Sequence, residues 1–233
     1  GDKRGKTIDF EKALTFEKEG VPAWGGDFKS LDFSKEVKGL KFDGTDFLPL
    51  QWNSVSDPKG SEEQVLTASS SSEADNALIF EATVPVENPT LTFDHFYEIE
   101  DGWDAGVVQV STDNGETWTS LANENTTSEF VPEVYPTIIE NAPGFTGFAE
   151  DWSTESFDLS KYAGQDVLVS FRYMTDWGHE DLGWFVDNIK VGSFTADGST
   201  TENFQSLGEL KGEYVNYVVT FIQTDKKGKQ KVV

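Results

Sequence analysis

Residues 166–174 read DVLVSFRYM, and every second residue from Val167 to Tyr173 is apolar. An alternation with a period of two places apolar side chains on one face of an extended strand. The segment VVQVS (107–111) alternates in a similar way, and no stretch of the chain shows sustained helical periodicity. The pattern therefore predicts an all-β fold.

Further short β-type runs, separated by turn residues, fill most of the chain. Their spacing, together with 21 Gly and a single Met, predicts a mostly antiparallel β-sandwich of the jelly-roll type. The predicted strands are LTF (14–16), GLKF (39–42), VLTAS (65–69), ALIFEATV (77–84), TLTFDHFYEI (90–99), GVVQVST (106–112), TWTSLA (117–122), SFDLS (156–160), DVLVSFRYM (166–174), GWFVDNIKV (183–191) and YVNYVVTFIQT (214–224).

Three zones follow from this pattern. Residues 1–38 form a polar lead-in segment, and residues 39–192 form the main sandwich. Residues 193–233 begin with the linker-like SFTADGSTTE and end in a strand, which we assign to a following module or to one packed on the sandwich.

The loop between about residues 123 and 155 is long and carries several aromatic residues. Loops of this length are usually functional or cross a sheet as ordered excursions. Tyr135, Phe145, Phe148 and Trp152 could stack on sugar rings if they are exposed. Burial of Tyr135, Phe145 and Trp152 against the sheet would count against that role.

The chain is strongly acidic, with 42 Asp and Glu against 18 Lys and Arg and a formal net charge of −24. Between Lys41 and Lys161 the only basic residue is Lys59. Such a field repels nucleic acids and anionic membranes and attracts divalent cations. No apolar run is long enough to span a bilayer. Cysteine is absent, which excludes disulfides and thiolate metal sites and leaves calcium as a possible staple for long loops.

The pair His179-Glu180 resembles the beginning of a zinc-peptidase motif. That motif needs a second histidine four residues after the first, on a helix. Gly183 occupies this position, and the only other histidine, His95, lies far upstream. A zinc-hydrolase site is therefore not predicted.

The segment STDNGETW (111–118) matches the Asp-box pattern S-x-D-x-G-x-x-W. Asn114-Gly115 suits a tight hairpin turn, and the Asp113 side chain can bond the turn amides. A single copy without an arginine cluster predicts a structural turn rather than a sugar site.

Acidic residues near both ends of the sandwich are the leading metal candidates. FDGTDF (42–47) contains Asp43 and Asp46, and the strand WFVDNI (184–189) contains Asp187. The first and last strands of a jelly roll lie close together, so these carboxylates could share a calcium ion, which prefers six to eight oxygen ligands. Asp75 and Asn76 could add ligands from a loop. A second acidic loop, EIEDGWDAG (98–106), with Asp101 and Asp104, is a lesser candidate that could face TDWGHED (175–181).

Long motifs also carry a family resemblance. The runs 90–126, PGFTGF (143–148) and 157–191 resemble, in the same order, the non-catalytic MAM-like region of immune inhibitor A-type secreted bacterial zinc metallopeptidases. FDGTDFLPLQW (42–52) fits the opening strand of such modules, and the resemblance covers about residues 39–192.

This resemblance implies a jelly roll of the MAM-like or galactose-binding-like kind, with structural calcium. Asp43 takes the place of the usual acidic ligand, and Asp187 is the other implied ligand. The family's catalytic zinc helix is absent from the sequence, so we expect no hydrolytic activity.

We therefore expect a calcium-stabilised accessory domain of a secreted bacterial metallopeptidase, serving domain packing, stability or substrate presentation. Its expected partners are the catalytic domain of the same polypeptide and protein or glycan surfaces, in an extracellular or cell-surface location. The alternative is a carbohydrate- or cell-surface-binding module, because fold does not settle function. A glycosidase, which needs two facing carboxylates in a cleft, ranks third.

Overall fold

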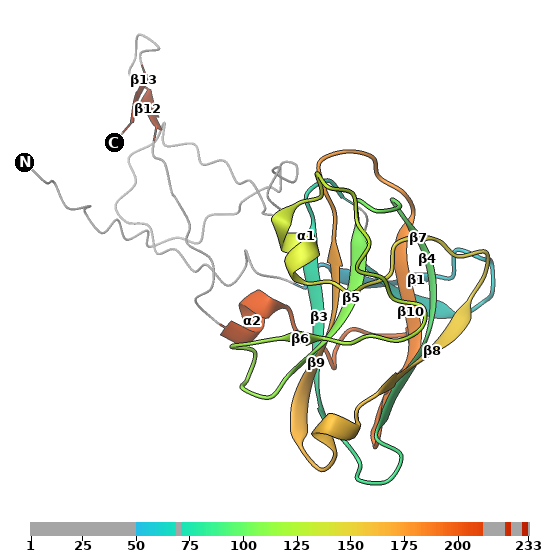
Figure 1. Ribbon diagram of the computed structural model, residues 1–233. Helices are drawn as coiled ribbons and strands as arrows, with labels where there is room; N and C mark the ends of the chain where they lie inside the picture. The colour runs from blue at the N-terminus through green and yellow to red at the C-terminus, as the bar shows by residue number, and fades with distance from the viewer. Residues whose placement is uncertain (1–49, 69–70, 212–221, 225–229, 233) are drawn as a thin grey trace, which may run out of the picture.

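Two antiparallel sheets face each other across an aromatic core in a computed structural model (Figure 1). The structure describes residues 50–68, 71–211, 222–224 and 230–232. Since side chains alternate across each strand, both sheets can turn apolar residues inward and polar ones outward. The predicted all-β sandwich is confirmed.

The larger sheet has seven strands in the order β1-β2-β10-β4-β7, with β11 also paired to β10 and β8 to β4. All of these pairings are antiparallel. The strands are β1 (Trp52–Ser56), β2 (Gln64–Ala68), β4 (Thr90–Ile99), β7 (Gly147–Phe148), β8 (Ser153–Asp158), β10 (Gly183–Val191) and β11 (Phe194–Ala196).

The smaller sheet has four strands in the order β3-β9-β5-β6, also antiparallel. They are β3 (Asp75–Thr83), β5 (Ala105–Ser111), β6 (Thr119–Ser120) and β9 (Asp166–Met174). A separate pair joins β12 (Ile222–Thr224) to β13 (Gln230–Val232).

Helical segments are short. They are α1 (Pro136–Glu140), α2 (Leu207–Lys211) and the 3₁₀ turn η2 (Ser160–Tyr162). No helix within the described residues has the length and apolar character to cross a membrane. Helix α1 packs through Ile138 on the outer face of the smaller sheet, against Ala105 and Val107 (Figure 1).

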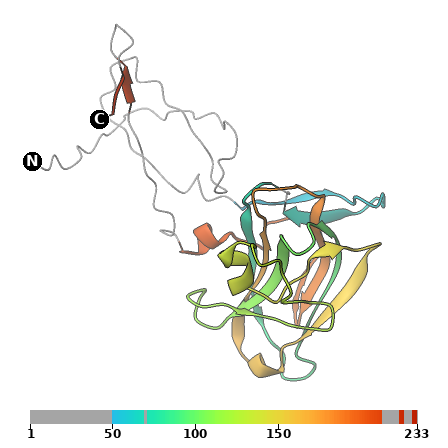
Figure 2. The ribbon, with the colours of Figure 1, turned by 45° about the horizontal axis from the view of Figure 1, so that its top comes forward.

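Aromatic rings fill the space between the sheets. Figure 2 shows the two sheets from a second direction. Phe171 of β9 lies with its ring centroid 4.8 Å from that of Phe93 and 5.6 Å from that of Trp184. Both partners belong to the opposite sheet. Gly106 lets the sheets approach, because a Cβ atom there would lie 2.7 Å from the Trp184 ring.

The strands predicted at 90–99, 166–174 and 183–191 are confirmed with the same bounds as β4, β9 and β10. The strand predicted at 156–160 lies earlier, at 153–158, and that at 117–122 is only two residues long. The strands at 14–16 and 39–42 lie outside the described residues, as does most of 214–224. The linker-like SFTADGSTTE (193–202) contains β11, which pairs with β10, and Phe204 just after it packs into the core.

Candidate metal centre

Three carboxylates meet at one end of the sandwich. Glu100 directly follows β4, Asp104 directly precedes β5, and Asp176 is the second residue after β9. Each contributes an oxygen, and these oxygens all lie within 4.8 Å of one another. Because β4 belongs to the larger sheet and β5 and β9 to the smaller, the group of carboxylates spans both sheets.

A tight turn brings Glu100 and Asp104 together. The backbone N–H groups of Trp103 and Asp104 both donate to the Glu100 carbonyl at 3.1 Å. Gly102 occupies the turn with φ +76°, a conformation that favours glycine, and its N–H donates to Thr146 Oγ1 at 2.9 Å. The sequence EIEDGWD thus turns back within five residues, which sets the two carboxylates side by side.

Asp176 is held against this turn by its own backbone. Its N–H donates to Asp104 Oδ1 at 2.8 Å, and its carboxylate accepts the Gly178 N–H at 2.6 Å. Its carbonyl accepts the N–H of Glu73 at 2.6 Å, which ties the β9–β10 connection to the segment before β3. The carboxylate of Asp176 is therefore fixed in position rather than free to turn to solvent.

Asp104 and Asp176 are buried and Glu100 is half-buried, with no compensating basic side chain among the described residues. Asp104 is 0% exposed and Asp176 is 6% exposed. Asp104 Oδ2 and Glu100 Oε2 are buried oxygens that accept no hydrogen bond. No described Lys or Arg forms an ion pair with any of the three. Buried charges in proteins are normally paired or bound to metal, so this group of carboxylates is suited to bind a cation.

The electrostatics of Asp104 also favour a bound cation. Burial is the largest influence that raises its pKa to about 7, and the negative charges of Asp176 and Glu100 act in the same direction. The hydrogen bond from the Asp176 N–H opposes these effects but does not cancel them. A bound cation would favour the ionised carboxylate.

The donor set fits a hard cation. Three carboxylates offer up to six oxygens, and calcium takes six to eight oxygen ligands in flexible geometry. Neither histidine joins them. His179 is exposed and contacts Asp181 at 3.2 Å, while His95 contacts Glu155 at 3.1 Å inside the sandwich. Calcium suits this donor set better than zinc, which prefers nitrogen and sulfur ligands.

The leading predicted metal ligands do not belong to this group. Asp43 and Asp46 are outside the described residues. Asp75 begins β3, and its carboxylate receives two hydrogen bonds from Arg172, at 2.7 and 2.8 Å. The backbone carbonyl of the adjacent Asn76 accepts the indole N–H of Trp52 at 3.0 Å.

Asp187 lies in β10 of the other sheet and accepts the backbone N–H groups of Asn188 and Gly198, each at 2.8 Å. A metal bound by these predicted residues stays a prediction.

The second acidic loop does face residues 175–181, through Asp104 and Asp176. Asp101, its other predicted acid, is exposed. Sequence reasoning missed Glu100 and Asp176 as members of the group. Their positions in the sequence could have identified them. Each lies within two residues of the end of a predicted strand, at the same end of the sandwich as Asp104.

The Asp-box turn is confirmed. Asp113 accepts the Thr117 N–H at 2.8 Å and its hydroxyl at 2.5 Å, and these bonds lower the pKa of Asp113 to about 2. Asn114 and Gly115 adopt φ values of +56° and +82°.

The loop aromatics divide between core and surface. Phe145 is fully buried in the core, and Tyr135 packs beside α1 with its hydroxyl donating to Glu73 at 3.0 Å. Trp152 is half-buried on the outer face of the larger sheet. Phe148 and Trp177 are exposed. This burial counts against a flat sugar-binding platform built from the 123–155 loop.

Comparison with known proteins identifies relatives for the region that holds these features. Residues 70–206 match the family described as immune inhibitor A-like, MAM domain. The chain is 31% identical over 120 residues to the pre-pro-metalloprotease PrtV of Vibrio cholerae serotype O1 (strain M66-2), covering 51% of the chain and 12% of that protein.

It is 30% identical over 141 residues to immune inhibitor A of Bacillus thuringiensis subsp. alesti, covering 60% of the chain and 18% of that protein. It is also 24% identical over 123 residues to bacillopeptidase F of Bacillus subtilis (strain 168), covering 53% and 7%. The chain thus spans less than a fifth of the length of each of these relatives.

Proposed function

This chain belongs to the immune inhibitor A-like MAM domain family, and from that premise we propose that it is a calcium-stabilised accessory domain of a secreted peptidase. The family is defined by an accessory region rather than by a catalytic domain. The similarity to a pre-pro-metalloprotease and to immune inhibitor A supports a catalytic domain in the same polypeptide as the partner.

The clustered carboxylates of Glu100, Asp104 and Asp176 carry the calcium part of the proposal. Asp104 Oδ2 and Glu100 Oε2 would act as ligands, because both are buried oxygens without a hydrogen-bond donor. Asp176 would add a carboxylate already held by Gly178. Calcium there would neutralise the buried charge.

The position of the ion explains what it would do for the fold. It would tie the β4–β5 turn to the β9–β10 connection, and so join the two sheets at one end. In a chain without cysteine, such a staple supplies a cross-link that disulfides provide elsewhere. An extracellular location, where calcium is plentiful and peptidases act, belongs to the same proposal.

Thermal unfolding with chelator and then with restored calcium tests the proposal. A ligand that binds only the folded state stabilises it by about 2.7 kcal/mol at a hundred times its Kd. We expect calcium to raise the Tm of the wild type. It should also raise the Tm of the control variant Asp101→Asn, which replaces an exposed acid in the same turn. We expect Asp104→Asn to lose the response. An equal calcium response in Asp104→Asn would reject this site.

A further inference from the structure

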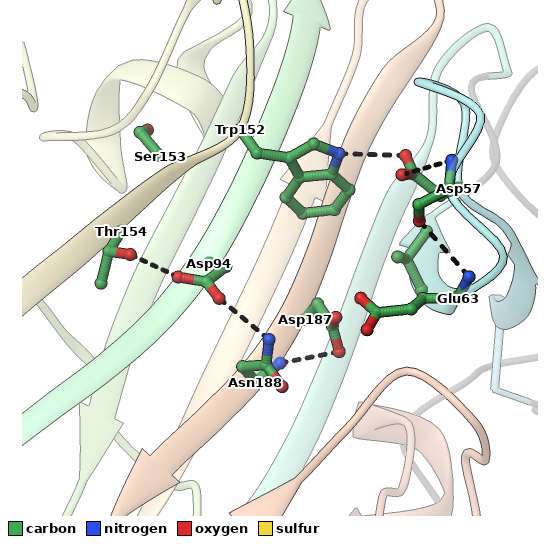
Figure 3. A pocket seen from close by; sticks show the side chains of 10 residues that line it. Asp57, Glu63, Asp94, Trp152, Ser153, Thr154, Asp187 and Asn188 are labelled. Atoms are coloured by element: carbon green, nitrogen blue, oxygen red, sulfur yellow. Dashed lines mark hydrogen bonds between the residues drawn. The ribbon is translucent and has the colours of Figure 1, made fainter.

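A second acidic feature lies on the outer face of the larger sheet. It is a pocket of about 430 Å³ between the β1–β2 hairpin, β4, β10 and the beginning of β8 (Figure 3). Its lining includes Asp57, Glu63, Asp94, Trp152, Asp187 and Asn188.

A β-bulge shapes the floor of this pocket. The pairing of β10 with β4 shifts register between Asp187 and Lys190, and Asn188 has a φ of +50°. Consecutive strand residues normally point to opposite faces, whereas both Asp187 and Asn188 line the pocket. Asn188 Nδ2 donates to Asp94 Oδ2 at 2.9 Å, which fixes Asp94 beside them.

Asp187 lines the pocket, and both of its backbone hydrogen bonds go to one of its two carboxylate oxygens. The side chain is 6% exposed, and its Oδ1 accepts both backbone N–H groups, from Asn188 and Gly198. Its Oδ2 accepts no hydrogen bond from the described residues. Burial raises the pKa of Asp187, and the charges of Glu63 and Asp94 add to that effect.

Like charges surround that oxygen. Asp94 is the direct cross-strand partner of Asp187 in the β4–β10 pairing, an arrangement that destabilises a sheet when both residues are ionised. The carboxylate of Glu63 lies next to that of Asp187 in Figure 3. The nearby Lys59 is engaged elsewhere, with Nζ on the Glu150 carbonyl at 2.9 Å and over the Phe96 ring at 5.0 Å.

An indole ring completes the pocket. Trp152 Nε1 donates to Asp57 Oδ1 at 2.9 Å, and the ring packs against Phe96 with centroids 6.2 Å apart. These contacts hold the indole beside the carboxylates, as Figure 3 shows. Carboxylates beside a fixed aromatic ring are the features that recognise a planar cation, because guanidinium both stacks on rings and bonds carboxylates in pairs.

The size of the pocket distinguishes between kinds of cation. A volume of about 430 Å³ falls in the lower part of the range for small-ligand sites, about 300–1,000 Å³. It is far more than one ion needs. A neutral sugar would leave the charges of Asp187, Asp94 and Glu63 uncompensated. We propose that this pocket binds an arginine side chain presented by a partner protein.

Titration with Nα-acetyl-arginine amide tests the proposal on the calcium-saturated chain, followed by ¹H–¹⁵N correlation spectra of the indole N–H groups. Nα-acetyl-citrulline amide, which has the same shape without the charge, is the matched ligand control. We expect saturable binding of the arginine ligand with a Kd of about 1 mM, as for a contact worth roughly 4 kcal/mol. The citrulline ligand should not bind.

Two variants locate the site. Glu63→Gln has an exposed side chain and should fold normally, and Asp187→Asn keeps an oxygen for the two backbone donors. Each should weaken arginine binding about tenfold, while Asp101→Asn at the other acidic site should leave it unchanged. Equal binding of citrulline, binding unaffected by both variants, or saturation of the pocket by calcium alone would each overturn the proposal.

Discussion

Replacing Asp104 by Asn should stabilise the calcium-free protein at pH 8 and abolish its response to calcium. Ordinary substitutions of a fully buried residue destabilise a fold. The opposite sign is expected here because Asp104 is 0% exposed and its pKa is raised to about 7. The ionised carboxylate is therefore disfavoured in the folded state.

The sign and size follow from proton linkage. Between about pH 4 and pH 7 the folded protein holds a proton on Asp104 that the unfolded chain releases, so the free energy of unfolding falls as pH rises. The pKa rises from 3.8 to about 7, a span of about three pH units at about 1.4 kcal/mol each. The contribution is thus roughly 4 kcal/mol at most, all of it expressed above pH 7. The amide removes this penalty.

Urea unfolding in the presence of chelator, at pH 5 and pH 8, measures the destabilisation caused by the ionised Asp104 carboxylate. The free energy of unfolding of Asp104→Asn minus that of the wild type should increase by about 2–4 kcal/mol from pH 5 to pH 8. Subtracting the wild type removes the pH dependence of the groups that do not interact with Asp104. With saturating calcium at pH 8, the order should reverse and the wild type should be more stable. A difference that does not change with pH would refute the reasoning.

Three substitutions inside the sandwich should each lower the free energy of unfolding by an amount, the cost of the substitution, that urea unfolding measures. Gly106→Ala should cost about 1–3 kcal/mol, because its Cβ would lie 2.7 Å from the Trp184 ring; a cost near zero would mean that the sheets can move apart freely. Phe145→Ala should cost about 3–5 kcal/mol, since the ring is 1% exposed; a small cost would place the ring outside the core in solution. Burial tends to raise the pKa of Glu155, but hydrogen bonds, first that from His95, outweigh it and lower the pKa. Glu155→Ala should therefore cost about 2–3 kcal/mol at pH 7 and less as pH falls through that pKa, and an unchanged cost at low pH would contradict this.

The sequence predicted the long strands well because their signals are local. In β4 and β9, apolar alternation and β-branched or aromatic residues extend over nine or ten positions, and both ends carry turn residues. The strands β1, β7 and β11 were not predicted. Each has two to five residues, and the structure shows them mainly through pairing with a neighbouring strand.

The candidate site was harder to predict because side-chain direction depends on turns and register. The acidic loop at 98–106 was expected to face 175–181, yet only the turn at Gly102 shows that Asp104 points inward while Asp101 points to solvent. Similarly, Asp75 pairs with Arg172 because the β3–β9 register places Arg172 opposite Ala77, two residues away. No spacing within either segment shows that register.

A crystal structure of the protein grown with calcium tests the central claim most directly. The account predicts one calcium ion between Glu100, Asp104 and Asp176, with oxygen distances of about 2.3–2.6 Å. It would be contradicted if only water or no density lay between these three carboxylates while calcium occupied a site elsewhere, for example at Asp187.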